Sequence, residues 1–381
     1  MEKDLVEFSK FRPITLILPS LFSELHGKAL PSIISEISKV KYIRNIVIGL
    51  DRANEKEFKK AKSFFSKLPQ QHEILWHDGP NLKKLDKQLK KHNLAPQQMG
   101  KGRNVWYCMG YILSVGKAEA VALHDCDIVT YSRSLLARLV YPVANPKFNF
   151  DFCKGYYPRV SENKVKGRVA RLLVTPLLRA LEKTIGFNEF ISFVDSFRYP
   201  LAGEFSFRRR VLKDIRIPYD WGLEIGVLSE MFRNYAGNRL CQVDIADNYD
   251  HKHQDIFFDD NSKGLSKMSV DIIKVIIRKL ASQGETFSMS IFRSLKATYY
   301  REALDFVQIY KKDALMNAYD IDVHEEETAV ELFAKNIMVA GQVFLDSPME
   351  SPNIPTWSRV DTALPGFLND LRKAVELDNK S

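Results

Sequence analysis

The first third of the chain alternates short, mainly apolar runs with stretches whose apolar residues recur at helical spacing. Apolar runs of this kind predict strands that are buried on both faces, as in a parallel sheet covered by helices on its two sides. The predicted strands are 14–18, 46–50, 73–76 and 118–123, and the predicted helices are 29–34, 55–68 and 105–113. The pattern therefore predicts an α/β fold, in which ligands bind beyond the carboxyl ends of the strands.

The pattern becomes mixed from about Asn149 and is wholly helical beyond Asp260. The predicted strands are here 150–157 and 240–245, and the predicted helices are 165–185, 222–235, 270–280, 287–307, 327–343 and 364–377. We expect residues 1–258 to form the α/β domain. Residues 259–381 should pack on it as a helical extension with a candidate homodimer contact.

Composition and charge narrow the class of partner. The chain has 381 residues, 45% of them apolar, and a net charge of +9. Its Lys and Arg residues are scattered among acidic residues, which favours a small phosphorylated or carboxylated partner over nucleic acid. The four cysteines show no paired spacing, the N-terminus is charged, and the first apolar run is too short to cross a bilayer. We therefore expect a cytoplasmic protein with reduced thiols and neither nucleic-acid nor membrane partners.

The most informative motif is Asp125-Cys126-Asp127, directly after the fourth predicted strand. Two carboxylates one residue apart at a strand's end can turn toward one ligand, one binding a divalent cation and the other a sugar or ribose hydroxyl. Oxygen ligands of this kind suit Mg²⁺ or Mn²⁺. A second pair, Asp320 and Asp322, lies between two helical patterns and is predicted to be a solvated helix start.

Glycine-flanked charges form the next group of candidates. Lys101 lies between two glycines, so it can reach a phosphate close to the backbone, or it can be a surface lysine on a flexible turn. Glu204 and Glu224 also lie beside glycines, where a carboxylate can hold sugar hydroxyls or stabilise an oxocarbenium-like centre. Alternatively, Glu224 is an acid at a helix N-terminus, favoured by the helix dipole.

Two further candidates are basic. Arg168 begins a predicted helix and can either hold an anionic acceptor or form an ion pair with a nearby acid. His251 and His253 follow a predicted strand, where one imidazole can bind a metal or simply be structural. No glycine-rich dinucleotide fingerprint follows the first strand and no P-loop is present, which disfavours both of those enzyme classes.

Taken together, the segments resemble the glucosyl-3-phosphoglycerate synthase family, retaining glycosyltransferases of the GT-A fold. The segments that carry the resemblance, in family order, are 18–24, 100–102, 125–127, 167–178, 199–204, 222–226 and 250–251. The resemblance implies transfer of glucose or mannose from a nucleoside-diphosphate sugar, with Mg²⁺ or Mn²⁺, to 3-phosphoglycerate, glycerate or a similar small hydroxy acid. The product would be a glycosylglycerate-type compatible solute or its precursor. The resemblance also implies that the domain has a nucleotide-binding half (1–130) and an acceptor half (131–258).

Residue roles carried over to matching positions follow from this resemblance. The expected nucleotide and donor residues, with Asp51 added because it follows the second strand, are Pro19, Ser20, Leu21, Glu24, Asp51, Lys101, Asp125, Leu201 and Gly203. Arg168, Val169 and Glu224 are expected at the acceptor, and Asp127 and His251 at the metal. Asp125 and Glu224 are the expected catalytic residues.

The chain departs from the family pattern mostly at the acceptor. Ala170 replaces a threonine, Pro158-Arg159 replaces a basic pair, Tyr249 replaces an arginine and His253 replaces an asparagine. The helical tail also extends beyond the family's usual end. Two alternatives stay open: an inverting enzyme of the same fold with a saccharide or lipid-linked acceptor, and a non-catalytic nucleotide-binding module.

Overall fold

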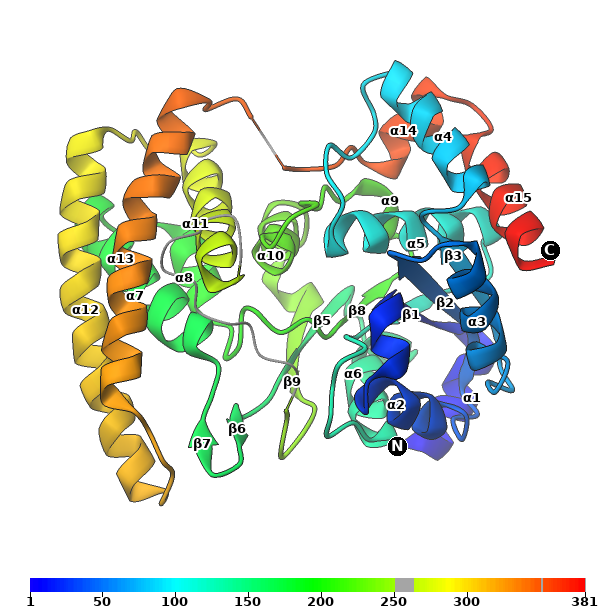
Figure 1. Cartoon of the computed structure of the whole chain (residues 1–381), viewed down its shortest axis with the longest axis horizontal. Helices are drawn as coiled ribbons and strands as arrows, with labels where there is room; N and C mark the ends of the chain where they lie inside the picture. The colour runs from blue at the N-terminus through cyan, green and yellow to red at the C-terminus, as the bar shows by residue number, and fades with distance from the viewer. Residues whose placement is uncertain (251–263, 351, 381) are drawn as a thin grey trace.

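The computed structural model describes residues 1–250, 264–350 and 352–380 (Figure 1). Within these ranges a seven-stranded sheet has the order β3-β2-β1-β4-β8-β5-β9. Its strands are β1 (Ile14–Leu21), β2 (Ile43–Asp51), β3 (Gln71–Trp76), β4 (Ala120–Leu123), β5 (Phe152–Tyr156), β8 (Phe205–Arg208) and β9 (Leu240–Asp244). β8 runs antiparallel to both of its neighbours, and the other pairings are parallel. The predicted α/β sheet is thus confirmed, with one reversed strand added.

Alternate side chains of the central strands enter two separate apolar cores. Ile17 and Val47 belong to one core, whereas Leu16, Leu18 and Ile46 belong to the other. Because both faces are buried, these strands are apolar over most of their central residues, as their sequence indicates.

Helices cover both faces of the sheet. One face carries α1 (Glu2–Phe11), α2 (Ala29–Ile37), α3 (Glu55–Phe65) and α6 (Arg133–Ala144). The other core includes α4 (Pro80–Lys91), α5 (Lys101–Val115), α7 (Thr175–Ile185), α8 (Glu189–Asp195), α9 (Val211–Asp214) and α10 (Leu223–Asn234). Short 3₁₀ turns, η1 (Phe22–His26) and η3 (Gly237–Arg239), follow β1 and precede β9.

The helical tail divides between the two sides of the molecule. α11 (Gly264–Ala281), α12 (Met289–Met316) and α13 (Val323–Asp346) pack beside α7, on the left in Figure 1. α14 (Trp357–Ala363) and α15 (Phe367–Lys380) lie on the opposite side, where α15 contacts α5 and β3. The tail therefore packs against the α/β domain on two opposite sides. α13 is long and apolar enough to cross a membrane by length and composition, but side chains such as Phe333 and Ile337 are buried in the core.

The predicted helix 165–185 begins in the wrong place. Residues before it form a hairpin of β6 (Val160–Ser161) and β7 (Lys164–Val165), and a π-helical segment, η2 (Val169–Val174), precedes α7. Gly167 adopts φ +74°, so the chain leaves the hairpin through a left-handed residue before the helix starts. β8, α1 and α6 were not predicted from the sequence pattern.

Candidate active site

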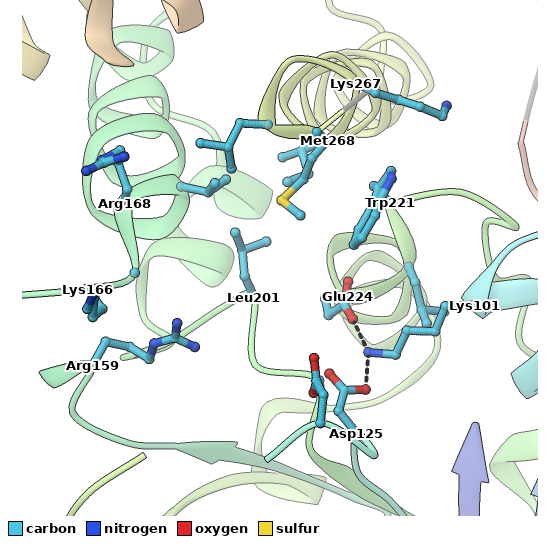
Figure 2. A pocket seen from close by; sticks show the side chains of 18 of the residues that line it. Lys101, Asp125, Arg159, Lys166, Arg168, Leu201, Trp221, Glu224, Lys267 and Met268 are labelled. Carbon is cyan, nitrogen blue, oxygen red and sulfur yellow. Dashed lines mark hydrogen bonds and ion pairs between the residues drawn. The ribbon is translucent and has the colours of Figure 1, made fainter. Parts of the chain in front are cut away.

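A cavity of about 1580 Å³ opens at the carboxyl ends of β1, β2 and β4 and extends to α11 and α13. Every described residue with an expected role lines it: Pro19, Ser20, Leu21, Glu24, Asp51, Lys101, Asp125, Asp127, Arg168, Val169, Leu201, Gly203 and Glu224. His251 and His253 lie outside the described residues. The sequence-derived set is therefore brought together in one cavity, with Lys101 beside Asp125 and Glu224 and with Arg168 on the opposite side (Figure 2).

A buried histidine holds the acidic turn after β4. His124 is 0% exposed; its Nδ1 lies 3.0 Å from the Asp125 carbonyl oxygen and its Nε2 lies 3.1 Å from the Tyr131 hydroxyl. Burial lowers the pKa of His124 to about 4, so its imidazole is neutral at pH 7. The ring thereby fixes the backbone from which the Asp125 carboxylate projects.

Lys101 joins the two carboxylates that were expected to be catalytic. Its ammonium lies 2.6 Å from Asp125 Oδ1 and 3.0 Å from Glu224 Oε1 (Figure 2). Burial alone would lower the pKa of Lys101, but the charges of Asp125 and Glu224 outweigh burial, and the pKa is raised. Lys101 is thus a fixed cation within the site rather than a surface lysine on a flexible turn.

The glycines around Lys101 serve a different purpose from the one expected. A Cβ at Gly100 would lie 2.3 Å from the Tyr219 carbonyl oxygen, and one at Gly102 would lie 1.8 Å from that of Pro218. The absence of a side chain at Gly100 and Gly102 therefore allows the backbone of residues 218–219 to approach closely. Gly203, by contrast, lies against a side chain of the site, because a Cβ there would be 2.5 Å from Asp125 Oδ2.

Asp127 lies among other acids. Burial, followed by the negative charges of Asp125 and Glu24, raises the pKa of Asp127 to about 7. A divalent cation beside this carboxylate would offset that repulsion, so the site suits a metal held through oxygen. The described residues contain no group of three or more His, Cys, Asp or Glu placed to hold a metal, so they do not enclose one by themselves.

Two carboxylates line the end of the cavity next to β1 and β2. Glu24 Oε2 accepts hydrogen bonds from Ser20 Oγ and the Leu21 N–H, both at 3.1 Å, which fixes the turn after β1. Asp51 Oδ2 accepts a hydrogen bond of 2.8 Å from Asn104. Asp51 Oδ1 is buried and has no hydrogen-bond partner among the described residues, so it can accept from a ligand.

Glu204 is a buried support residue. It is 0% exposed and accepts hydrogen bonds from the Tyr157 hydroxyl at 2.9 Å and the Tyr249 hydroxyl at 2.6 Å. The two tyrosine rings are stacked with centroids 3.5 Å apart. Burial, then the charge of Asp125, raises the pKa of Glu204. Glu204 is fully buried and is not among the residues that line the cavity, so the structure shows it supporting the two tyrosines and not facing a sugar.

Arg168 at the basic end is already paired with acids. Its Nη2 lies 3.1 Å from Glu325 and its Nε 3.1 Å from Glu326, which also pairs with Arg171 at 2.7 Å. The alternative that Arg168 bridges to an acid is therefore confirmed. Both glutamates come from α13, more than 150 residues away along the chain, and sequence spacing gave no sign of them.

The second acid pair proves to be part of the cavity wall. Asp322 caps α13 by accepting a 3.0 Å hydrogen bond from the Glu325 N–H, so the predicted helix start is confirmed. Asp320 and Asp322 nevertheless line the same cavity as Asp125 and Asp127. The segment is thus less remote from the site than its sequence position suggested.

Comparison with known proteins decides the family. The chain is 45% identical over 379 residues to glucosyl-3-phosphoglycerate synthase of Persephonella marina, which covers 100% of this chain and 94% of that protein. It is 36% identical over 373 residues to the enzyme of the same name from Methanococcoides burtonii, covering 97% and 91% of the two chains. The chain belongs to the glucosyl-3-phosphoglycerate synthase family. No family model matches it.

Solved structures agree on the fold. Glucosyl-3-phosphoglycerate synthase from Mycobacterium tuberculosis, in complex with Mn²⁺, UDP and glucosyl-3-phosphoglycerate, aligns with TM-score 0.54 at 19% identity over 76% of this chain and 86% of that one. Mannosyl-3-phosphoglycerate synthase from Rubrobacter xylanophilus aligns with TM-score 0.53 at 21% identity over 75% and 80%. These matches confirm the GT-A fold. The expectation that the tail exceeds the family's usual end is wrong for the relatives from Persephonella and Methanococcoides, whose matches cover essentially the whole chain.

Proposed function

We propose that this protein is a metal-dependent retaining glycosyltransferase that moves glucose from a nucleoside-diphosphate sugar to 3-phosphoglycerate. The observation that carries the proposal is one cavity with a carboxylate-rich end at the sheet edge and a cationic end opposite. The cationic end is lined by Arg159, Lys166, Arg168 and Arg171, two of which are paired with Glu325 and Glu326. A sugar nucleotide held through a metal suits the first end, and a small anion suits the second. Family membership supports the same reaction, since both full-length relatives are named for it.

The donor would lie along β1, β2 and β4. Pro19, Ser20, Leu21 and Glu24 would surround the nucleoside with Asp51, whose buried Oδ1 can accept a ligand hydrogen bond. Asp125 would contact the ribose or the donor sugar, and Leu201 and Gly203 would close over the sugar. Lys101 would keep Asp125 and Glu224 in place and add positive charge near the diphosphate.

Asp127 would hold Mg²⁺ or Mn²⁺, with His251 as the second protein ligand that the resemblance assigns. The mycobacterial relative was crystallised with Mn²⁺ and UDP-glucose, and in a separate structure with Mg²⁺ and UDP. When bound, the metal would stabilise the negative charge of the leaving diphosphate. The chain's own contribution is a turn whose backbone His124 fixes and whose carboxylates therefore need little reorganisation.

The acceptor would enter from the basic end. Arg168, Val169 and Glu224 are the residues that the resemblance assigns to it, and all three line the cavity. The acceptor hydroxyl would attack from the leaving-group face and pass its proton to a diphosphate oxygen. Glu224 is the best-placed supporting carboxylate, because Lys101 fixes one of its oxygens.

The reaction is tested with the purified protein, Mg²⁺ or Mn²⁺, a panel of UDP-, GDP- and ADP-sugars, and 3-phosphoglycerate or glycerate. Mass spectrometry should detect a hexosyl-phosphoglycerate, and Asp127→Ala should abolish its formation. Full metal-dependent transfer by Asp127→Ala would exclude the site assignment. If NMR shows a β-linked product from an α-linked donor, the enzyme is inverting and not retaining. Nucleotide binding without turnover of any acceptor would instead favour a non-catalytic binding module.

We also propose a homodimer formed through the C-terminal helices. The end of α12 exposes Ile309, Leu315 and Met316, with Leu315 and Met316 71% and 75% exposed. Light scattering after gel filtration should give twice the chain mass, and Leu315→Glu should shift it toward the monomer. A monomeric wild-type protein would reject this contact. Cytoplasmic location, the domain division at 258/259 and the lack of nucleic-acid and membrane partners stay predictions.

A further inference from the structure

The cationic end of the cavity contains two kinds of basic side chain. Arg168 and Arg171 are neutralised by Glu325 and Glu326 of α13. Glu326 is 2% exposed, so this pairing is buried, and separating it would leave uncompensated charge in the interior. An anionic ligand could gain Arg168 only by competing with Glu325.

Arg159 differs from both in having no carboxylate partner among the described residues. It lines the same cavity, its Nε and Nη1 are shielded from water and make no hydrogen bond to a described residue, and its guanidinium carbon lies 5.7 Å from the centroid of the Tyr249 ring. A buried guanidinium nitrogen without a partner is costly in a native protein and indicates a ligand group that is absent. Its planar fork matches a phosphate or carboxylate held through two hydrogen bonds.

The backbone brings Lys166 beside Arg159. The Lys166 N–H donates a 2.7 Å hydrogen bond to the Arg159 carbonyl oxygen across the hairpin. Gly167 makes room for the arginine stem, because a Cβ there would lie 3.1 Å from both Arg159 Cβ and Cγ. Figure 2 shows Arg159 reaching into the cavity from the same side as Lys166 and Arg168, opposite the Lys101 and Asp125 pair. No carboxylate pairs with Lys166 within the described part of the chain.

We propose that Arg159 and Lys166 form the subsite for the acceptor's terminal phosphate, with Arg168 a secondary contact that competes with Glu325. This inference rests on the proposed function and adds which residues read the charge of the acceptor. Its physical basis is that Arg159 has no carboxylate partner among the described residues, whereas Nε and Nη2 of Arg168 already lie 3.1 Å from Glu326 and Glu325 of α13. A doubly charged phosphate should therefore depend on Arg159 far more than a singly charged glycerate does.

The test is calorimetric binding of 3-phosphoglycerate and of glycerate to the full chain in the presence of UDP and Mn²⁺. Loss of charge-assisted hydrogen bonds in Arg159→Gln should raise the Kd for 3-phosphoglycerate about 10- to 100-fold. Lys166→Gln should raise it several-fold, and Arg168→Gln less than Arg159→Gln. For glycerate, the change in Arg159→Gln should be at most a few-fold.

Arg198→Gln is the matched control. Arg198 donates a hydrogen bond to the hydroxyl of Tyr156, the last residue of β5, and is exposed outside the cavity. The variant should bind both acceptors as the wild type does. Arg159→Lys should recover part of the phosphate affinity, which separates charge recognition from misfolding; melting curves of each variant check the fold.

Three outcomes would overturn the subsite: wild-type affinity of Arg159→Gln for 3-phosphoglycerate, a larger loss in Arg168→Gln, or no phosphate binding by the wild type. A different result would contradict the proposed function without contradicting the subsite. A wild-type protein that binds 3-phosphoglycerate through Arg159 but transfers no sugar would retain the subsite and lose the reaction.

Discussion

His124 is the residue on which the acidic turn depends most directly, although it is not among the cavity-lining residues. It is buried on all sides, which keeps its imidazole neutral, and its two ring nitrogens lie within hydrogen-bond distance of the Asp125 carbonyl and the Tyr131 hydroxyl. Its pKa, about 4 when folded against 6.5 in the unfolded chain, makes the protein sensitive to acid at this position. Between these two values the unfolded chain binds a proton that the folded chain does not. The contribution of the neutral His124 to the free energy of unfolding is therefore fully present above about pH 6.5 and is lost as the pH falls toward 4.

The first prediction compares the wild type with His124→Gln, which cannot titrate. Urea unfolding at pH 7 should show the variant to be less stable, because the buried hydrogen bonds are weakened. At pH 5 this difference should shrink by about 2 kcal/mol, since only the wild type loses stability to protonation of an unfolded histidine. An unchanged difference between the two pH values would show that His124 is not held neutral.

Gly203 sets how closely its loop approaches the donor carboxylate. In Gly203→Ala the new methyl group would lie 2.5 Å from Asp125 Oδ2 and 2.8 Å from Lys101 Nζ, so one of these groups must move. We expect kcat/KM for the sugar nucleotide to fall about 100-fold, as for other misplacements of about 1 Å in an active site, with a small change in Tm. Gly237→Ala is the control, since a Cβ there meets nothing within 4 Å. Equal activity of the two variants would contradict a donor role for this loop.

These residues show what sequence could and could not reveal at this scale. Asp125, Asp127 and Lys101 were predictable because each stands beside a strand end or a helix start whose local pattern is strong. Glu325 and Glu326 were not, because their only local signal was that of a capped helix start. Their pairing with Arg168 depends on how α13 packs against η2, which no spacing along the chain records.

At the scale of elements, strong periodicity succeeded and short or interrupted segments failed. β1 to β4 and α10 to α13 were anticipated because each has an apolar run or stripe. β8 instead alternates phenylalanine with polar residues after a glycine-containing loop, and its reversed direction is set by pairing with β4 and β5. The onset of the helix near Arg168 was misplaced because the apolar and basic residues of 165–168 fit a helix, whereas Gly167 turns the chain first.

Gly167 gives the prediction at this scale. Gly167→Ala places an L side chain at φ +74° and brings a methyl group to 3.1 Å from Arg159 Cβ and Cγ. We expect a loss of about 1–2 kcal/mol in stability from the backbone and weaker 3-phosphoglycerate binding from the displaced arginine, with donor binding unchanged. Gly186→Ala supplies the control, because φ is +88° there but nothing lies within 4 Å. Identical acceptor affinity in the two variants would rule out a link between this turn and the acceptor site.

At the scale of the whole molecule, the tail connects the two ends of the fold. α11 and α13 line the side of the cavity that contains Arg168, whereas α14 and α15 cover α5, the helix that begins at Lys101. Trp357 stacks on Trp106 of α5 with centroids 3.9 Å apart and donates a 2.9 Å hydrogen bond to its carbonyl oxygen. Gly110 of α5 allows this approach, because a Cβ there would lie 2.1 Å from Trp357. The sequence predicted helices in the tail but not their return to α5 and β3, since contacts between distant segments leave no periodic trace.

If α14 and α15 are part of the core, a single truncation in them should weaken the whole protein. Trp357 is 1% exposed, and Trp357→Ala should lower the free energy of unfolding by about 3–5 kcal/mol, the usual cost of removing a buried aromatic side chain. Urea titrations followed by far-ultraviolet circular dichroism and by retained transferase activity should shift together to lower denaturant. Leu377→Ala, at a 59% exposed position of α15, should leave both curves in place. Because α5 presents Lys101 to Asp125, loss of the stack should disturb activity and folding in one transition; activity that survived after the tail had unfolded would instead make α14 and α15 a separable appendage.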